Sequence, residues 1–548
     1  MKKKKTIVVL PLILAVIISV AASCSIQNKK GDDETMTDTA GTAQTDNNIT
    51  DDTGRGSGIL GTSIRENGAK GDGKSDDHYA FIKGADGWLM IPKGKYLIKK
   101  DIVIKDNMSI SPGAVIMPDD GVTVTVEGQI DAGKYKIFGE GGKFVINTEN
   151  ECCPEWFGAK ADGKTDSTVA IQKAIDSFSD GCGTVVFSSG TYIISDSLRI
   201  SEGQCFLTLR GTTGKIREST PSIIIADRKK PALEIKGASA GGTFDGNLEG
   251  VTVSHLVFSR SVMGGENSDT ILIENTLYTT LEHVGFSKSQ NGVRAVNANG
   301  LRFNGCHGTT GGDIIGKEVR GIYIDGTERG STGILVTDYI YYGYASEKSI
   351  SYAYKDISKV GDTGDRRISN FECAGTVDYG IAIYSDASGW AEDISINAMT
   401  MDGVRKSGIW LSSAGARTWQ QANISNVYLR LAFNGGEALT VKKFSNVNVA
   451  AFHVDNAVEN GGNTAISKED SPGGTISASS FGGADYESII SLTGCKDSAV
   501  IGCTSEYSGK IVLKSSENCI IASNAMPKAV LEVTGSSNCE IGLNRFSQ

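Results

Sequence analysis

The feature that most limits the fold is a run of short strands, each led by a glycine, in the second half of the chain. Apolar residues alternate with other residues after five such glycines: Gly292, Gly321, Gly333, Gly380 and Gly408. Near the C-terminus three sets of residues recur every 20 positions: Ser498, Asn518 and Asn538; Ile501, Ile521 and Ile541; and Thr504, Asn524 and Asn544. Three short strands with their turns use about 20 to 25 residues, and such units stack at about 4.8 Å with apolar residues inside. The sequence therefore predicts an all-β solenoid, a parallel β-helix.

A second feature is a duplication in the first third of the chain. The segment GAKGDGKSDD at residues 68–77 is similar to GAKADGKTDS at residues 158–167. A strand, a glycine turn and another strand follow each copy, as WLMIPKGKYLIK at 88–99 and as TVVFSSGTYIIS at 184–195. Repeats of this kind indicate a solenoid that begins twice. The first copy has the shorter helical stretch and is the more degenerate.

The second copy also predicts a short helix. Asp166 or Ser167 can cap its N-terminus. Apolar residues then follow at i, i+3, i+4 and i+7, namely Ile171, Ala174, Ile175 and Phe178. Such spacing gives one apolar stripe. We expect this helix to close one end of the stack of strands.

The residues around the second copy resemble a known family. PEWFGAKADGKTDSTVAIQKAI at 154–175 and GCGTVVFSSGTYIIS at 181–195 are similar to the N-terminal signature of the pectate-lyase superfamily domain found in rhamnogalacturonases and tailspike depolymerases. GQIDAGKYKIFGEGGKFVI at 128–146 resembles the segment that often precedes it. The resemblance implies a right-handed single-stranded parallel β-helix with a short N-terminal capping helix, and a polysaccharide partner. Tailspike relatives are trimers, so a homotrimer is one assembly that the resemblance implies.

The resemblance does not fix the reaction, because one fold hosts many activities. The chain lacks the polygalacturonase set of Asn-Thr-Asp, Asp-Asp, Gly-His-Gly and Arg-Ile-Lys, the nearest fragment being Cys306-His307-Gly308. It also lacks the Asp-Pro-His-Glu motif of the alginate epimerases.

The N-terminus has the pattern of a lipoprotein signal peptide. Lys2 to Lys5 precede the apolar run from Ile7 to Val20, which Ala21, Ala22, Ser23 and Cys24 follow. The run is shorter than the roughly 18 residues of a membrane-spanning helix. It predicts a signal peptide over 1–23 and a lipid on Cys24. We expect the mature protein to be anchored in the cell membrane or outer membrane, facing away from the cytoplasm.

The rest of the chain divides into three predicted parts. Residues 24–58 are rich in Asp, Thr, Asn and Gly and predict a disordered tether. A degenerate β-rich unit is expected over 59–153, and the main β-helix over 154–548. The formal net charge of −10 argues against nucleic acid as a partner. The ten cysteines other than Cys24 show no zinc-ligand spacing.

Alternation within the glycine-led strands predicts which side chains face the solvent. Residues one and three positions after each glycine are apolar and should point inward, so those at two and four should point outward on one face. The predicted outward residues are Arg294, Tyr323, Asp325, Leu335, Thr337, Ala382, Tyr384, Trp410 and Ser412. Aromatic rings beside carboxylates suit a sugar, whose apolar side stacks on Tyr or Trp. The candidate substrate-binding residues are Tyr323, Tyr384, Trp390, Arg405 and Trp410.

Four aspartates are the candidate catalytic acids: Asp325, Asp378, Asp386 and Asp402. Carboxylates on adjacent rungs would lie about 5 Å apart, which suits a retaining glycosidase, and a two-rung separation approaches the wider spacing of an inverting one. Asp378 and Lys406 both stand two positions before a glycine, so we expect them to be stacked neighbours with Arg405 beside them.

The same cluster allows a polysaccharide lyase. Lys406 or Arg405 would then be the base, and Asp378 with Asp386 would help to hold Ca²⁺, a cofactor that only the lyase reading requires. We therefore expect a cell-surface enzyme that degrades polysaccharide, a glycoside hydrolase or a polysaccharide lyase. A non-catalytic carbohydrate-binding or adhesive surface lipoprotein is the alternative.

Overall fold

The computed structural model divides the chain into two units, Met1–Arg55 and Gly56–Gln548. It describes residues 61–147, 151–179, 182–212, 221–238, 248–311, 317–326, 330–344, 349–359, 361–362, 364–385, 389–390, 392–414, 420–458 and 462–547. The predicted signal peptide, Cys24, the tether and Asp386 lie outside these residues. No helix within them is long and apolar enough to cross a membrane.

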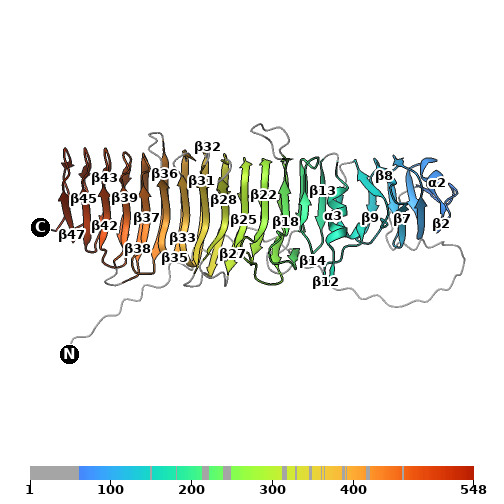
Figure 1. The fold of residues 1–548 in the computed structure, drawn as a ribbon, viewed down its shortest axis with the longest axis horizontal. Helices are drawn as coiled ribbons and strands as arrows, with labels where there is room; N and C mark the ends of the chain where they lie inside the picture. Colours follow the sequence, from blue (N-terminus) through green and yellow to red (C-terminus); the bar gives the residue numbers. More distant parts are fainter. Residues whose placement is uncertain are drawn as a thin grey trace, which may run out of the picture. The chain divides into compact units, whose positions relative to one another are not determined.

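The first part of the second unit contains three small parallel sheets and the short helix α2 (His78–Ile82). One sheet has the order β1 (Gly61–Ser63), β3 (Trp88–Ile91), β6 (Met108–Ile110) and β9 (Ile130–Ala132). The others are β2 (Asp72–Asp76), β4 (Gly94–Ile98) and β7 (Ala114–Pro118), and β5 (Ile102–Ile104), β8 (Thr123–Val126) and β10 (Lys143–Ile146). In Figure 1 these strands run from blue to teal and precede the main stack.

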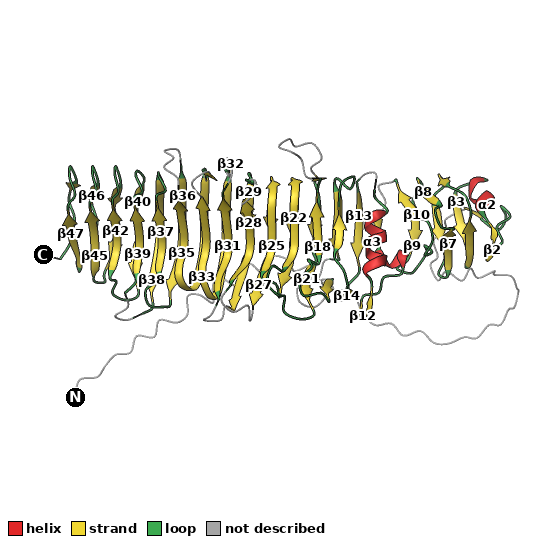
Figure 2. Ribbon diagram, in the orientation of Figure 1, coloured by secondary structure: helices red, strands yellow, loops and turns green. Residues whose placement is uncertain are grey.

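The main part is one continuous parallel sheet of 36 strands, wound so that three columns of strands alternate along the chain. β33 (Arg366–Ser385) and β35 (Ile394–Ser413) pass through all three columns, and β36 (Ala422–Leu431) and β38 (Val447–Asn456) through the first two. Figure 2 shows the strands of successive turns side by side. This arrangement confirms the right-handed parallel β-helix.

The remaining strands belong to single columns. Column 1 contains β11 (Glu151–Cys152), β13 (Gly183–Phe187), β16 (Leu207–Gly211), β20 (Thr252–Ser254), β23 (Thr280–Glu282), β26 (Arg302–Asn304), β29 (Ile334–Thr337), β40 (Thr475–Ser477), β43 (Ala499–Ile501), β46 (Ile520–Ala522) and β48 (Glu540–Ile541). Column 2 contains β12 (Asp162–Asp166), β14 (Thr191–Ile194), β17 (Ser222–Ile225), β21 (Val257–Arg260), β24 (Gly285–Ser287), β27 (His307–Gly311), β30 (Ile340–Tyr344), β41 (Ser480–Gly482) and β44 (Thr504–Ser505). Column 3 contains β15 (Leu198–Ile200), β18 (Leu233–Lys236), β22 (Asp269–Leu277), β25 (Asn291–Asn299), β28 (Glu318–Gly326), β31 (Ile350–Ser358), β37 (Glu437–Lys442), β39 (Thr464–Glu469), β42 (Ser488–Thr493), β45 (Gly509–Lys514) and β47 (Ala529–Thr534). Outside the columns, β19 (Leu248–Glu249) pairs with β22, and β32 (Gly361–Asp362) pairs with β34 (Gly389–Trp390).

The predicted capping helix is α3 (Thr168–Asp176), and the 3₁₀ turn η1 (Pro154–Phe157) precedes it. Its apolar stripe is buried against the first rungs, and Figure 2 shows it in red beside them. The Asp166 carboxylate accepts a hydrogen bond from the Thr168 N–H at 2.9 Å, whereas the Ser167 hydroxyl accepts one from the Lys160 N–H. The N-cap position is therefore Ser167, without a side-chain cap, and Asp166 accepts the N–H of the first helical residue alone.

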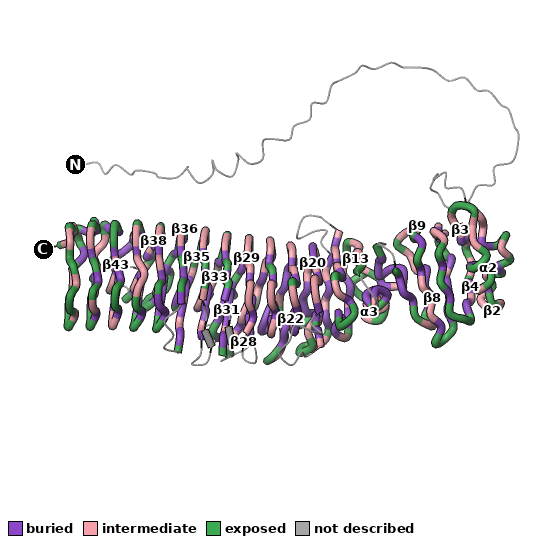
Figure 3. Tube along the Cα trace, turned by 90° about the horizontal axis from the view of Figure 1, so that it is seen from above, coloured by how far each residue is buried: buried purple, intermediate pink, exposed green. Residues whose placement is uncertain are grey.

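The core of the stack is the inward side of the strands. Ile322, Ile324, Ile381, Ile383 and Leu411 are all at most 1% exposed, as alternation predicts. Figure 3 shows buried segments alternating with more exposed ones around each turn of the chain. Each strand therefore offers its other side chains to the surface.

The glycine-led strands do not all share one face, which corrects the prediction. Ile334–Thr337 is β29 of column 1, and it pairs with Arg302–Asn304 and with the first residues of β33. Leu335 and Thr337 therefore lie on a different face from Tyr323 and Trp410. Local alternation distinguishes inside from outside but does not identify the column.

The 20-residue period also needs a correction. Ile501 lies opposite Ala522, and Thr504 lies opposite Ala525, so the first step is 21 residues. The turn between β44 and β45 holds one residue more than the matching turn of the next rung. Ile501 is consequently exposed while Ile521 is buried. Ser498, Ile501 and Thr504 therefore do not align with the other two residues predicted for their sets. Those other two residues do align with each other, at a spacing of 20.

One rung carries an ion pair inside the core. Asp356 of β31 lies in register with Ile324 and Ile383, so its side chain points inward. It accepts hydrogen bonds from Arg366 Nε at 2.6 Å and from the Tyr354 hydroxyl at 2.9 Å. Asp356 and Arg366 are each 1% exposed. A buried charge without its partner is strongly unfavourable, so each of the two depends on the other.

We predict that Asp356→Ala lowers the free energy of unfolding by about 3 to 5 kcal/mol, because it leaves the Arg366 charge buried and unpaired. Urea denaturation measures the loss. The double variant Asp356→Leu with Arg366→Met should recover most of it. Glu234→Ala breaks the exposed ion pair with Arg199 and serves as the control, with a loss below about 1 kcal/mol. An equally small loss for Asp356→Ala would contradict the prediction.

Candidate functional site

The outer face of column 3 carries two rows of polar and aromatic side chains. Hydrogen-bonded register aligns the first row as Asp269, Asn291, Arg320, Tyr352, Tyr379, Ser407 and Glu437. The second row is Leu272, Arg294, Tyr323, Lys355, Ala382, Trp410 and Thr440. Neighbouring members of a row are about 4.8 Å apart at the backbone, so they touch or exchange hydrogen bonds.

Four aromatic rings form a ladder in the middle of this face: Tyr352, Tyr379, Trp410 and Tyr384. The rings of Tyr352 and Tyr379 stack at 4.8 Å with an interplanar angle of 9°. Trp410 lies 5.4 Å from Tyr379 and 6.2 Å from Tyr384, measured between ring centroids. Tyr352 is buried, whereas the other three are partly exposed. The ladder gives the face an apolar strip that a sugar can stack on.

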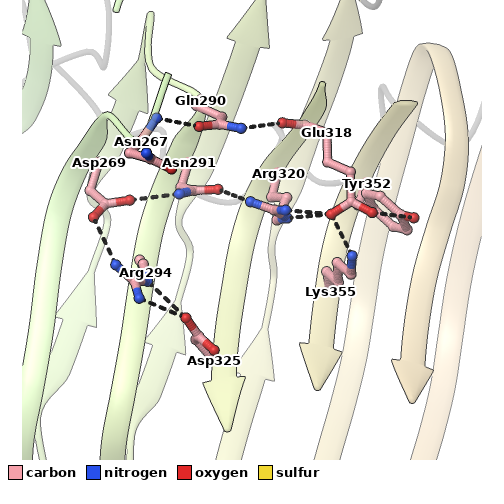
Figure 4. A network of polar contacts seen from close by, with 10 residues as sticks. All are labelled: Asn267, Asp269, Gln290, Asn291, Arg294, Glu318, Arg320, Asp325, Tyr352 and Lys355. Atoms are coloured by element: carbon pink, nitrogen blue, oxygen red, sulfur yellow. Dashed lines mark hydrogen bonds and ion pairs between the residues drawn. The ribbon is translucent and has the colours of Figure 1, made fainter. Parts of the chain in front are cut away.

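Arg294 bridges two buried aspartates at the N-terminal end of the face (Figure 4). Its Nε and Nη2 donate to Asp325 Oδ2 at 3.0 and 2.7 Å. Its Nη1 lies 3.9 Å from Asp269 Oδ2. Asp269 is 5% exposed and Asp325 4%. The two carboxylates therefore lie on opposite sides of one guanidinium.

The surroundings of the Asp269 carboxyl differ from those of the Asp325 carboxyl. Burial raises the pKa of its carboxyl above the ordinary value, against the hydrogen bond from Asn291 and the charge of Arg294. The Asn291 amide donates to Asp269 Oδ1 at 2.7 Å. Asp269 therefore keeps its proton to a higher pH than a solvated aspartate, while Asp325 receives two charged hydrogen bonds.

A second cluster surrounds Glu318. Lys355 Nζ donates to Glu318 Oε2 at 2.5 Å, Arg320 Nε donates to the same oxygen at 3.1 Å, and the Tyr352 hydroxyl donates to Oε1 at 3.2 Å. Burial raises the pKa of Glu318, but Lys355 and Arg320 outweigh it and hold that pKa low. Burial lowers the pKa of Lys355, and the ion pair only partly offsets this. Figure 4 shows this cluster joined to Asp269 through Asn291 and Arg320.

The predicted neighbours Asp378, Arg405 and Lys406 are brought together. Arg405 Nη2 donates to Asp378 Oδ2 at 2.8 Å, and Lys406 Nζ lies 4.0 Å from Asp378 Oδ1. They line a pocket of about 450 Å³ with Ser349, Ile350 and the loop Phe433, Asn434 and Gly435. Asp378 also accepts hydrogen bonds from the N–H and hydroxyl of Ser351.

The other predicted site residues are more scattered. Tyr384 and Trp410 lie on the aromatic ladder, and Asp325 lies on the same face. Tyr323 points outward but is only 7% exposed, because the Arg320 guanidinium lies 4.4 Å above its ring. Asp386 and the side chain of Trp390 lie outside the described part of the chain.

Asp402 is not near this face, which corrects the prediction. It lies at the end of the column 2 segment of β35, where it registers with Arg430 and lies 3.9 Å from its Nη1. Gly403, at φ +83°, then turns the chain into column 3. Such a turn suits glycine, and the residues around it, Met401-Asp402-Gly403-Val404, gave no sign of which column follows.

Four residues of the face were missed from the sequence: Asp269, Glu318, Lys355 and Tyr379. β22 and β31 carry Thr270 and Ala353 at the position that Gly292 and Gly321 occupy in the neighbouring strands, so their strands lack the glycine that marked the others. Asp269 and Tyr379 stand at the residue before that position, which the alternation scheme did not count. The useful signal was the register, which only the structure supplies.

Asp378, one of the two residues predicted to help hold Ca²⁺, does not fit that ion, and the other, Asp386, lies outside the described residues. Asp378 Oδ2 accepts hydrogen bonds from Ser351 and Arg405, and a cationic guanidinium at 2.8 Å opposes a metal there. Among the described residues, no three His, Cys, Asp or Glu side chains are close enough to share a metal ion.

Comparisons with solved structures find parallel β-helix proteins. The surface adhesin PfbA of Streptococcus pneumoniae is 14% identical over 69% of this chain and 91% of that chain, with a TM-score of 0.40. The A-module of the Azotobacter vinelandii mannuronan C-5 epimerase AlgE6 is 15% identical over 71% and 99%, with a TM-score of 0.41. A tailspike mutant of E. coli bacteriophage HK620 in complex with a hexasaccharide is 12% identical over 71% and 80%, with a TM-score of 0.49. Curated proteins gave no match.

The sequence itself matches a family model. The match spans residues 155–428, half of the chain, and the family is described as rhamnogalacturonase A/epimerase, pectate lyase-like. This range contains α3, the aromatic ladder, Arg294 with its two aspartates, and the cluster of Asp378, Arg405 and Lys406. The chain therefore belongs to the rhamnogalacturonase A/epimerase, pectate lyase-like family of parallel β-helix proteins.

Proposed function

We propose that the protein is a glycoside hydrolase that binds polysaccharide along the outer face of column 3 and cleaves it beside Asp269 and Asp325. The observation that carries the proposal is this pair of buried carboxylates on either side of Arg294, in contrasting surroundings and on the same face as the aromatic ladder. Paired carboxyl groups in unlike surroundings mark acid and base roles.

The roles follow from the chemistry of each carboxyl. Asp269, with its raised pKa, is the general acid that donates a proton to the leaving oxygen. Asp325, ion-paired with Arg294, is the base that takes a proton from the attacking water. The Asp269 and Asp325 oxygens lie 3.9 and 2.7 Å from two nitrogens of the same guanidinium, so they are at most roughly 9 Å apart, which allows the roughly 6.5 to 9.5 Å between the carboxyls of inverting glycosidases.

The ladder supports a polymeric substrate. Five rungs separate Asp269 from Trp410, roughly 24 Å along the stack. A chain of several sugars can therefore occupy both the carboxylates and the aromatic rings at once. The side chains between Asp269 and Trp410 include both acidic and basic groups, which can accept hydrogen bonds from sugar hydroxyl groups and donate hydrogen bonds to them.

A lyase is the second candidate, and Lys355 is the observation that favours it. Its pKa is lowered by burial, as a base for proton removal beside a uronate carboxylate requires. Arg320, which contacts the same Glu318 carboxylate, and Arg294 on the same face supply positive charge that neutralises the uronate. Lys355, Arg320 and Arg294 add to Arg405 and Lys406, so this face carries more basic side chains than the sequence suggested.

We also propose that the enzyme acts at the cell surface, anchored by a lipid on Cys24. The proposal is supported by the lysine-rich start, the short apolar run and the small residues before that cysteine.

We predict that Asp269→Asn lowers kcat by about 100-fold to 10,000-fold, because a general acid is lost. In the wild type the rate should fall as the pH rises above the raised pKa of Asp269, since only the protonated form donates. The variant should lose this alkaline limb. Release of reducing ends from polysaccharide, followed across pH, measures both effects.

Asp338→Asn is the matched control, because Asp338 is exposed at a turn between columns 1 and 2 and should leave rate and pH profile unchanged. If Asp269→Asn retains the wild-type rate, the assignment of the acid is wrong. If the wild type binds glycan but releases no reducing ends, the non-catalytic binding protein takes the place of the enzyme.

Trp410→Ala should weaken polysaccharide binding about tenfold, because it removes the central ring of the ladder. The change should appear in KM rather than in kcat, since Trp410 is distant from the two aspartates. Tyr342→Ala, an exposed tyrosine of column 2, is the control and should have no effect. Equal KM values for the Trp410 variant and the wild type would show that sugars do not stack there.

The lyase is tested by ultraviolet absorbance of the unsaturated product on acidic polysaccharide. If absorbance rises with the reducing ends, Lys355→Met should abolish both, because it removes the base and keeps a side chain of similar length. If reducing ends rise without absorbance, the hydrolase is supported, and Lys355→Met should retain most of the rate.

A further inference from the structure

A separate row of aligned side chains runs along column 2 at the C-terminal end of the stack. Register places Tyr428, His453, Ser480, Thr504, Ala525 and Arg545 one after another on successive rungs. This row lies on a different column from Asp269 and the aromatic ladder and shares no residue with them.

These rungs enclose a pocket of about 480 Å³, here named the C-terminal groove. Its floor consists of small residues, namely Ser480, Gly482, Thr504 and Ala525. One wall is Glu506 and Tyr507, in the turn that holds one residue more than its counterpart in the next rung. The longer turn and the small floor together produce a hollow where a β-helix face is ordinarily flat.

The two ends of the groove are not alike. His453 lines one end, and the Tyr428 ring next to the pocket stacks on it at 5.2 Å and 17° and is 40% exposed. His453 Nδ1 is held 2.6 Å from the Ser480 hydroxyl, which fixes the imidazole in the stack. At the other end Arg545 is exposed. A ligand thus meets an aromatic ring, then hydroxyl groups, then a guanidinium.

The groove's chemistry selects among the possible occupants. A peptide that adds to a sheet needs an exposed strand edge, but here the strands of column 2 are paired on both sides. A nucleic acid needs a basic surface, and Glu506 lines the groove while Asp455 and Asp402 flank Arg430 next to it. A carbohydrate chain needs a ring to stack on and hydroxyl partners repeated along one direction, and the groove has both.

We propose that the C-terminal groove is a secondary polysaccharide-binding site, which holds a stretch of the same polymer that column 3 processes. This inference rests on the proposed function for the identity of the polymer. The groove repeats at the rung spacing of about 4.8 Å, so it accepts an extended chain rather than a compact molecule. A polysaccharide long enough to occupy both sites has a raised effective concentration at column 3 when it is bound in the groove. A short oligosaccharide gains nothing from the groove.

The test fills the groove without disturbing the core. Ala525 is an exposed floor residue, so Ala525→Trp places an indole in the hollow and leaves the inward side unchanged. Ile520→Trp is the matched control, because Ile520 is exposed on the same rung in column 1. Tyr428→Ala removes the stacking ring by a separate route. Thermal unfolding midpoints equal to that of the wild type confirm that each variant folds.

Full-length wild type and variants are compared by affinity electrophoresis in gels that contain xylan, β-glucan, galactan, polygalacturonate or alginate. On the polymer that retards the wild type, Ala525→Trp should weaken binding at least about tenfold, and Tyr428→Ala about threefold to tenfold. Ile520→Trp should bind as the wild type does. Cleavage of oligosaccharides of that polymer, too short to span both sites, should be the same in all four proteins.

Each other outcome is decisive. Wild-type binding by both Ala525→Trp and Tyr428→Ala overturns the groove, whether or not the polymer is cleaved. Loss of binding in these variants without any cleavage by the wild type overturns the proposed hydrolase and keeps the groove. Retardation on none of the five polymers overturns the groove as a site for such glycans. Capture of a protein segment that Ala525→Trp abolishes would replace the glycan as occupant.

Discussion

The parallel, in-register pairing of successive rungs is the constraint on which the rest of this structure depends. Because each strand is hydrogen-bonded to the matching strand of the next turn, inward residues stack into one core and outward residues stack into rows. Residues more than 100 positions apart, such as Asp269 and Trp410, thereby share a face. The site is a product of register, and a shift of one residue in any rung would exchange its side chains between core and surface.

The same stacking explains why charged residues are buried on this face. At about 4.8 Å between rungs, a carboxylate on one strand meets the guanidinium or ammonium of the next, so Asp325, Glu318 and Asp378 each have a basic partner. Such pairs are weak evidence for stability, since desolvation opposes their attraction. Asp269 differs because its contact with Arg294 is longer and burial dominates its pKa. This difference distinguishes Asp269, the proposed acid, from Asp325, Glu318 and Asp378, which are in closer ion pairs.

Columns 3 and 2 differ in the side chains that they present to a linear polymer. Column 3 combines buried ionisable groups with stacked rings and is suited to chemistry. The C-terminal groove on column 2 has one stacked ring, small residues and hydroxyl groups, and is suited to holding a chain. In a solenoid a new site needs only a few side chains and one longer turn, because the neighbouring rungs already provide the frame.

The sequence by itself determined the fold, the capping helix and the inward positions, because these follow from local alternation and from apolar spacing that any single rung displays. It also placed Asp378 beside Lys406 and Arg405, since Asp378 and Lys406 each lie two positions before a glycine and Arg405 directly precedes Lys406. Only the tertiary structure decided which column each strand joins. It moved Leu335, Thr337 and Asp402 away from the site and brought Asp269, Glu318, Lys355 and Tyr379 into it. The physical reason is that column and register depend on the length of each turn, and a single added residue, as between β44 and β45, leaves no mark in the local pattern of apolar residues.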